Sequence, residues 1–412
     1  MATTVSVSAG YHIHDESAVK TVADTIAYRP STRYTFAKAA PNEIVDRDSA
    51  LFRFFEKLSL LRKSADSVKT VSIVHIGDSH IQADFLTGTA RKLMNHYFGN
   101  PGRGLIAPNR LMRSNNGRHY RITSSNQWKH SFVVKPNSIP IGITGLGLQT
   151  RDIVADINIS TIDESFPGEW DFNTITTYCD LEKTDVNLLQ SNITDSNIIN
   201  SYAKVFKMDS LTNNVSLSFV SPEREISVSG FNLANSGRGV FYHSIGVNGA
   251  KFCDYNNCSE SFYAQVASLN PDIVIISLGT NEAMTRTVNE STLHSDMAGL
   301  VNSIRTAAPY TAIMFTTPAE VFVRTGRRAS ATPNSRTGKV RDIIAKFAEQ
   351  NGFPCWDLFR ITGGKGSALE WNKKRLMVRD RIHFTQRGYE YQGELLFEAI
   401  VKSYNQYIKE RS

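Results

Sequence analysis

The sequence is poor in cysteine and has no long hydrophobic run. Its 412 residues include only four cysteines, which is too sparse for a disulfide-built scaffold. No stretch approaches the roughly 20 apolar residues of a transmembrane helix. Residues 1–27 lack the basic start and apolar core of a secretory signal, so the sequence predicts either a cytosolic chain or a mature chain with a new initiator Met. It also has no internal repeat and no low-complexity tract.

Two of the cysteines are close in sequence. Cys253 and Cys258 flank a short polar segment, which we expect to form a turn that lets the two sulfurs meet in a disulfide. Such a bond would suit an oxidising compartment. No second pair of ligands follows at zinc-like spacing, so we expect no metal site there. Cys179 and Cys355 lie in apolar, strand-like surroundings and are predicted to be buried free thiols.

The charge balance is mildly basic. The 46 Lys and Arg residues exceed the 39 Asp and Glu residues, which gives a formal net charge of +7. An excess of this sign favours an anionic partner, but the chain contains no dense Lys/Arg block. We therefore expect a solvated basic surface and no nucleic-acid partner.

Apolar strands alternate with amphipathic helices over much of the chain. The strand patterns lie at 71–76, 272–278 and 311–315, and each stops at a turn residue. Apolar residues at helical spacing predict helices at 42–66, 289–308, 336–350 and 386–409. This alternation indicates a parallel sheet with helices on both faces, a three-layer α/β/α fold.

The region from 120 to 235 differs from the rest of the chain in composition and in its hydrophobic pattern. It is rich in Ser, Thr, Asn, Val and Ile, with short alternating runs and a turn signal about every ten residues. This pattern is typical of an all-β sandwich. We therefore expect an α/β domain in two parts, 1–119 and 236–412, with a β-sandwich at 120–235 inserted between them.

Three short motifs carry residues suited to nucleophilic catalysis. Gly-Asp-Ser-His at 77–80 follows the first strand and places Ser79 at a sharp turn. Asn281 follows the strand 272–278, and Asp380 precedes His383 by three residues in the loop before the last helix. Open parallel sheets bind ligands at the carboxyl ends of their strands, where these motifs are expected to meet. Each motif alone also fits an ordinary turn or helix cap.

Taken together and in this order, the motifs resemble the conserved blocks of the SGNH/GDSL hydrolase superfamily. The resemblance implies that Ser79 is the nucleophile, His383 its base, and Asp380 the carboxylate that orients the imidazole. It also implies an oxyanion hole made by the Ser79 backbone N–H, the Asn281 amide and a glycine of a further block. We choose Gly249 for that glycine, with Gly246 as the alternative.

The first block resembles a subgroup of the superfamily. His80 stands where Leu is usual and Ala83 where Gly often follows, and the form of 77–84 is similar to that of bacterial peptidoglycan O-acetylesterases. Those enzymes carry an inserted β-sandwich resembling a carbohydrate-binding module, at the place of 120–235 here. The resemblance implies a flavodoxin-like sheet with a jelly-roll-like insertion, an acetylated glycan as substrate, no cofactor or metal, and a periplasmic or secreted location.

Other functions are compatible with the same residues. The protein could deacetylate xylan or another polysaccharide, or transfer acetyl to a sugar instead of water. A third reading is a catalytically inactive carbohydrate-binding protein. The sequence also leaves two roles open for His80, which either lines the site or packs beneath the turn, while His75 is expected to be a hydrogen-bonded core histidine.

Overall fold

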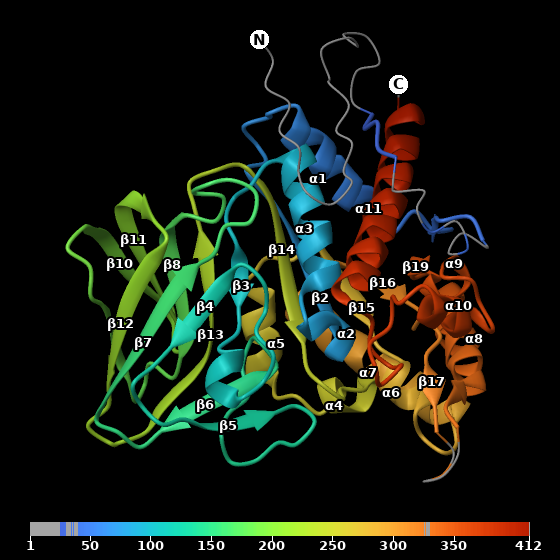
Figure 1. The fold of residues 1–412 in the computed structure, drawn as a ribbon. Helices are drawn as coiled ribbons and strands as arrows, with labels where there is room; N and C mark the ends of the chain where they lie inside the picture. The colour runs from blue at the N-terminus through green and yellow to red at the C-terminus, as the bar shows by residue number, and fades with distance from the viewer. Residues whose placement is uncertain are drawn as a thin grey trace.

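The structure is a computed structural model that describes residues 25–29, 34, 36, 40–324, 326 and 330–411 (Figure 1). Most of the segment 1–27, in which the sequence shows no secretory signal, therefore lies outside the described residues. Within the described part of the chain, no helix combines the length and the apolar character needed to cross a membrane.

A six-stranded sheet forms the centre of the α/β part, in the order β1-β19-β16-β15-β2-β14. Its strands are β1 (Ile44–Val45), β2 (Thr70–Gly77), β14 (Gly239–Gly246), β15 (Ile273–Ser277), β16 (Ala312–Thr316) and β19 (Cys355–Trp356). All neighbours run parallel except the edge strand β1. The register aligns Gly77 with Gly246 on one side and with Ser277 on the other, so these strands end at one edge.

Helices cover both faces of this sheet. Along β2, Val71 and Ile73 join one hydrophobic core, while Val74 and Ile76 join the other. The first core includes α1 (Phe52–Arg62), α3 (Phe85–Phe98) and α11 (Gln386–Lys409). The second includes α4 (Phe252–Asn256), α5 (Glu260–Ala267), α7 (Glu290–Ala307) and α8 (Ser335–Gln350). The predicted three-layer fold is confirmed.

Short elements lie around the carboxyl ends of the strands. They are α2 (Ser79–Gln82), α6 (Thr280–Ala283), α9 (Leu358–Ile361), α10 (Ser367–Lys373) and the hairpin of β17 (Phe322–Val323) and β18 (Thr332–Pro333). In Figure 1 the helices α2, α4 and α6 lie together at the lower end of the sheet. This is the edge at which the sequence motifs were expected to meet.

The predicted helix at 42–66 is too long at its amino end. Residues 44–45 instead form β1, which pairs with β19. Asn42 accepts a hydrogen bond from Trp356 Nε1 at 2.9 Å and donates one to Glu398 at 2.7 Å. These tertiary contacts tie the segment to the sheet edge, and the helix begins only at Phe52.

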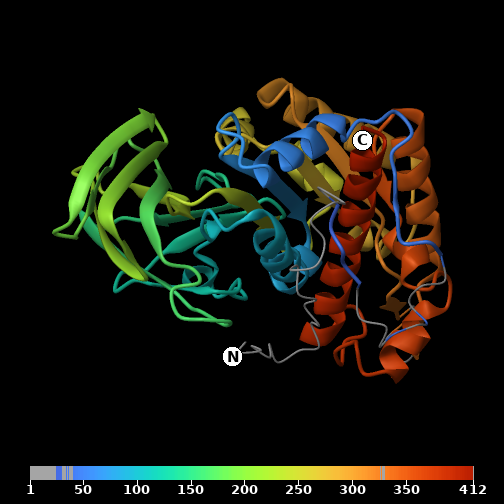
Figure 2. The same ribbon diagram turned by 90° about the horizontal axis from the view of Figure 1, so that it is seen from above.

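The β-rich region forms two antiparallel sheets that share a third core. One contains β10-β11-β8-β13-β6-β5 with β3 on β13, and the other β4-β7-β12-β9. Their bounds are β3 Gly104–Ile106, β4 Tyr120–Thr123, β5 Lys129–Phe132, β6 Leu146–Thr150, β7 Val154–Thr161, β8 Phe172–Cys179, β9 Asp185–Leu188, β10 Ile193–Asn200, β11 Ala203–Thr212, β12 Asn214–Val220 and β13 Ile226–Ala234, with a 3₁₀ turn, η2, at Asn109–Met112. Figure 2 shows this region beside the α/β layers. Because β3 pairs with β13, this sheet also draws on chain before residue 120.

The predicted disulfide between Cys253 and Cys258 is wrong, since both thiols are free. The segment between them winds into α4 instead of a flat turn. Cys253 lies within this helix, whereas Cys258 lies two residues beyond its last residue, Asn256. Cys179 and Cys355 are buried free thiols, as expected.

Candidate active site

Ser79 is placed by a tight turn between β2 and α2. A Cβ on Gly77 would lie 2.3 Å from Ile81 Cγ1 and 2.7 Å from the Ser277 carbonyl oxygen, so only glycine fits there. Asp78 caps α2 by accepting a hydrogen bond from the His80 backbone N–H at 2.9 Å. Ser79 is then the first helical residue, where a backbone N–H has no acceptor within the helix.

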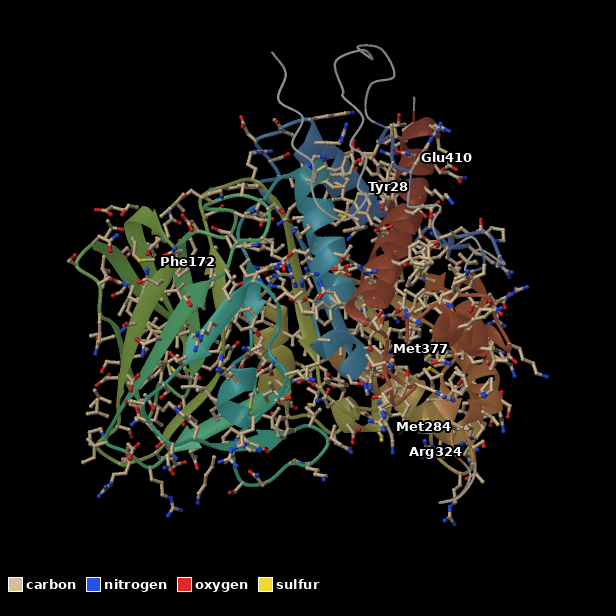
Figure 3. The ribbon with its side chains drawn as sticks, viewed as in Figure 1. Tyr28, Phe172, Met284, Arg324, Met377 and Glu410 are labelled. Carbon is tan, nitrogen blue, oxygen red and sulfur yellow. The ribbon has the colours of Figure 1, made fainter. Side chains whose placement is uncertain are left out.

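The loop before α11 carries Asp380 and His383 to this serine. His383 Nε2 lies 2.8 Å from Ser79 Oγ, and His383 Nδ1 lies 2.8 Å from Asp380 Oδ2. A hydrogen bond from the Val378 N–H to the His383 carbonyl closes the loop. Figure 3 labels Met377 at the start of this loop. The structure thus brings together the three residues that the sequence assigned to a triad, although they lie up to 304 positions apart.

Hydrogen bonds keep Asp380 ionised. Partial burial alone would raise the pKa of this carboxyl, but hydrogen bonds from the His383 ring and from the backbone N–H groups of His383 and Ile382 lower it. Oδ1 accepts the two backbone N–H groups at 2.9 and 2.7 Å, which leaves Oδ2 facing the imidazole. A carboxylate in this position fixes the ring and favours the Nδ1–H tautomer.

The residues predicted for the oxyanion hole lie close to the nucleophile block. Gly249 follows β14 with φ +83°, and its backbone N–H has no acceptor among the described residues. Gly246, the alternative, has a packing role: a Cβ there would lie 2.2 Å from the Gln82 nitrogen. Asn281 Nδ2 donates to the Ala250 carbonyl at 3.0 Å and to Asp78 Oδ2 at 3.3 Å.

A buried carboxyl, Asp78, and a partly buried one, Glu282, lie behind this group. Burial raises the pKa of Asp78 to about 7 and that of Glu282 to about 7. Glu282 Oε1 accepts the Phe252 backbone N–H at 2.8 Å, while Oε2 has no partner in the described part of the chain. Glu282 was not predicted, because a Glu after Asn281 in the sequence gives no sign of its burial.

Two neighbouring side chains stabilise the site. Gln82 Oε1 accepts the Asn248 backbone N–H at 2.8 Å and so ties the loop of Gly249 to α2. His75 is the hydrogen-bonded core histidine that was expected, with Tyr242 Oη 2.8 Å from Nδ1 and Ser277 Oγ 2.6 Å from Nε2. The described residues contain no cluster of His, Cys, Asp or Glu suited to a metal ion.

Residues 209–391 match the model of the GDSL-like lipase/acylhydrolase family. The chain is similar to that family over this segment, which is less than half of its length. The match includes Gly249, Asn281, Asp380 and His383 but begins after Ser79. This match supports a carboxylic ester hydrolase. No curated protein matches its sequence.

Solved structures agree with the fold. The GDSL-like chain is similar to a peptidoglycan O-acetylesterase, with a TM-score of 0.72 and 20% identity over 87% of this chain and 99% of the other. A lipase/acylhydrolase from Enterococcus faecalis matches 40% of this chain and 78% of its own, with 22% identity and a TM-score of 0.31. The acetyl xylan esterase AlAXEase matches 39% of this chain and 81% of its own, with 18% identity and a TM-score of 0.32. At these identities the likeness to the first structure establishes the fold, including the β-rich region.

Proposed function

We propose that this hydrolase is a serine O-acetylesterase that removes acetyl groups from a carbohydrate polymer, with peptidoglycan as the preferred substrate. The observation that carries the proposal is the hydrogen-bonded chain from Ser79 Oγ through His383 to Asp380 at the carboxyl edge of the sheet. This arrangement suits transfer of an acyl group to a serine.

In the first step, Ser79 Oγ attacks the acetyl carbonyl carbon while His383 Nε2 takes the hydroxyl proton. Asp380 holds the ring and stabilises the imidazolium that forms. The negative charge on the carbonyl oxygen is received by the backbone N–H groups of Ser79 and Gly249 and by the Asn281 amide. The bond to the sugar oxygen then breaks, and His383 returns the proton to the leaving hydroxyl.

In the second step, water resolves the acetyl-enzyme. His383 removes a proton from the water as its oxygen attacks the acetyl carbon, and the same donors receive the second oxyanion. The bond to Ser79 Oγ breaks, the serine regains its proton from His383, and acetate leaves. The side chains already described supply every proton transfer.

The preference for an acetylated glycan rests on the likeness to a peptidoglycan O-acetylesterase, which extends over both the α/β part and the β-rich region. We propose accordingly the division into 1–119, 120–235 and 236–412, with the β-rich part presenting the glycan to the site. A wall polymer as substrate further implies a periplasmic or secreted location.

Acetate release from O-acetylated peptidoglycan, acetylated xylan and a small activated acetate ester tests the proposal. We expect release from peptidoglycan well above that from xylan, and loss of release from all three in Ser79→Ala. Full activity of Ser79→Ala would refute the mechanism. Faster turnover of xylan than of peptidoglycan would refute the proposed substrate preference. Transfer of acetyl to added deacetylated glycan would show that the enzyme is an acetyltransferase and not a hydrolase.

A further inference from the structure

His80 directly follows the nucleophile, and the reaction steps above leave it without a task. Its ring lies against that of His383, with the ring centroids 5.4 Å apart and the planes inclined by 33°. Phe384 and Tyr389 complete the surroundings, with centroids 5.9 and 5.7 Å away. His80 therefore lies beside the imidazole that must stay aligned between Ser79 and Asp380.

Tyr389 fixes the ring of His80 from the other side. Its hydroxyl lies 2.9 Å from His80 Nδ1. Tyr389 belongs to the first turn of α11, is 2% exposed, and stacks on Phe85 with the planes inclined by 13°. A buried tyrosine packed in this way is a rigid anchor, so the hydrogen bond defines the orientation of the His80 ring.

His80 also lines a small pocket. His80 Nε2 and Gln392 Nε2 are both buried and have no hydrogen-bond partner among the described residues. Both side chains line a cavity of about 30 Å³ behind the nucleophile turn, which Asp78 and Thr280 also line. A pocket of this volume accommodates one ordered water, and a water there can bridge two unpaired nitrogens.

The ring must also be uncharged for this role. Burial lowers the pKa of His80 to about 3, and the nearby His383 acts in the same direction, against the opposing effect of Asp380. A second positive charge beside His383 would oppose formation of the imidazolium in the reaction. A neutral His80 instead offers a polarisable ring face and two fixed hydrogen-bonding atoms.

We propose that His80 is a positioning residue that holds the His383 ring in line with Ser79, and that Tyr389 and a buried water shared with Gln392 hold His80 in turn. The inference rests on the proposed esterase function and deepens it. It also assigns a task to the histidine that stands where the commoner family motif has leucine.

The test compares Tyr389→Phe with Tyr391→Phe on the small activated acetate ester. Both tyrosines lie in α11 and are 2% exposed. The Tyr389 hydroxyl contacts His80 and the Phe384 backbone, and the Tyr391 hydroxyl donates to the Tyr34 carbonyl at 3.2 Å. We expect kcat to fall about fivefold to tenfold in Tyr389→Phe with KM unchanged, and both constants to stay at the wild-type level in Tyr391→Phe.

Imidazole nitrogen NMR gives a second readout that a purely structural role would not move. We expect a single neutral tautomer of His80 between pH 5 and 8 in the wild type, and mixed tautomers in Tyr389→Phe. His80→Leu is expected to lower kcat further than Tyr389→Phe, and Tyr389→Phe keeps the test valid if that variant fails to fold.

Equal kinetics of the two tyrosine variants, or a titrating His80 in the wild type, would overturn the inference. Ser79→Ala measured in parallel separates this failure from that of the proposed function. If Ser79→Ala is inactive and the tyrosine variants are equal, only the positioning role is refuted; if Ser79→Ala retains full activity, the esterase mechanism itself is.

Discussion

Asp380 and Asp84 are both carboxylates that bind nitrogen-bearing side chains, but one is exposed at the candidate active site and the other is buried in an ion-pair cluster. Both have a lowered pKa and both contact a nitrogen-bearing side chain. Asp380 is 46% exposed and contacts one imidazole, whereas the Asp84 side chain is 3% exposed and contacts two guanidinium groups. The exposed carboxylate orients a group that changes its charge during the proposed reaction, and the buried one holds charges that stay fixed.

The Asp84 cluster links the nucleophile segment to the β-rich region. Arg91 of α3 lies 2.9 Å from one carboxylate oxygen, and Arg103, just before β3, lies 2.6 Å from the other. Burial alone would raise the pKa of Asp84, but these two cations hold it well below its usual range. Arg103 also donates to the Arg118 carbonyl at 3.1 Å. The segment 80–84 therefore connects Ser79, at the carboxyl edge of the sheet, with the buried ion pairs of Asp84.

The largest effect expected from this comparison is on stability. Asp84→Asn leaves Arg91 and Arg103 buried without a counter-charge, so we expect the free energy of unfolding to fall by about 3–5 kcal/mol. The matched variant Asp380→Asn should change it by less than about 1 kcal/mol, because a half-exposed pair is screened by solvent. Chemical denaturation of the two purified variants measures both values, and similar losses would contradict the distinction.

A smaller effect concerns pH. Glu282 has a pKa raised by burial to about 7, so its folded state binds the proton more tightly than its unfolded state. This stability is fully present below about pH 4.5 and is lost as pH rises through 7. Glu282→Gln keeps an acceptor for the Phe252 N–H and removes the titration.

We therefore expect the wild type to lose about 3 kcal/mol more stability than Glu282→Gln between pH 4.5 and 8. Asp78 contributes a loss of the same sign in both proteins. The exposed Glu223 supplies the control, and Glu223→Gln should follow the wild-type curve. If the free energies of unfolding of the wild type and Glu282→Gln change with pH in parallel, the pKa of Glu282 is not raised by folding, and the prediction is wrong.

The sequence predicted what depends on local pattern. Buried strands that end at glycine specify where Ser79 and Asn281 emerge, because parallel strands end at a common edge. The loop of Asp380 and His383 followed from its place before a strong amphipathic helix. The same reasoning failed for Cys258, where a polar segment wound into a helix instead of a turn.

What the sequence could not predict depends on contacts between distant segments. Arg103 meets Asp84 only after β3 joins the β-rich sheet, and nothing in its neighbourhood marks it as buried. Tyr389 reads as one of several aromatics on α11, and its bond to His80 appears only when the helix packs beside α2. Buried charge pairs and hydrogen bonds between distant segments, such as these two, form only when the chain has packed, so the local sequence does not predict them.

The central claim, that Ser79 carries the acyl group, is tested most directly by intact-protein mass spectrometry during turnover of a small activated acetate ester, quenched in acid. We expect the mass of one added acetyl group, located at Ser79 by peptide mapping and absent from Ser79→Ala. Turnover in the wild type with an acetyl group on another residue, or an unchanged acetylated species in Ser79→Ala, would contradict it.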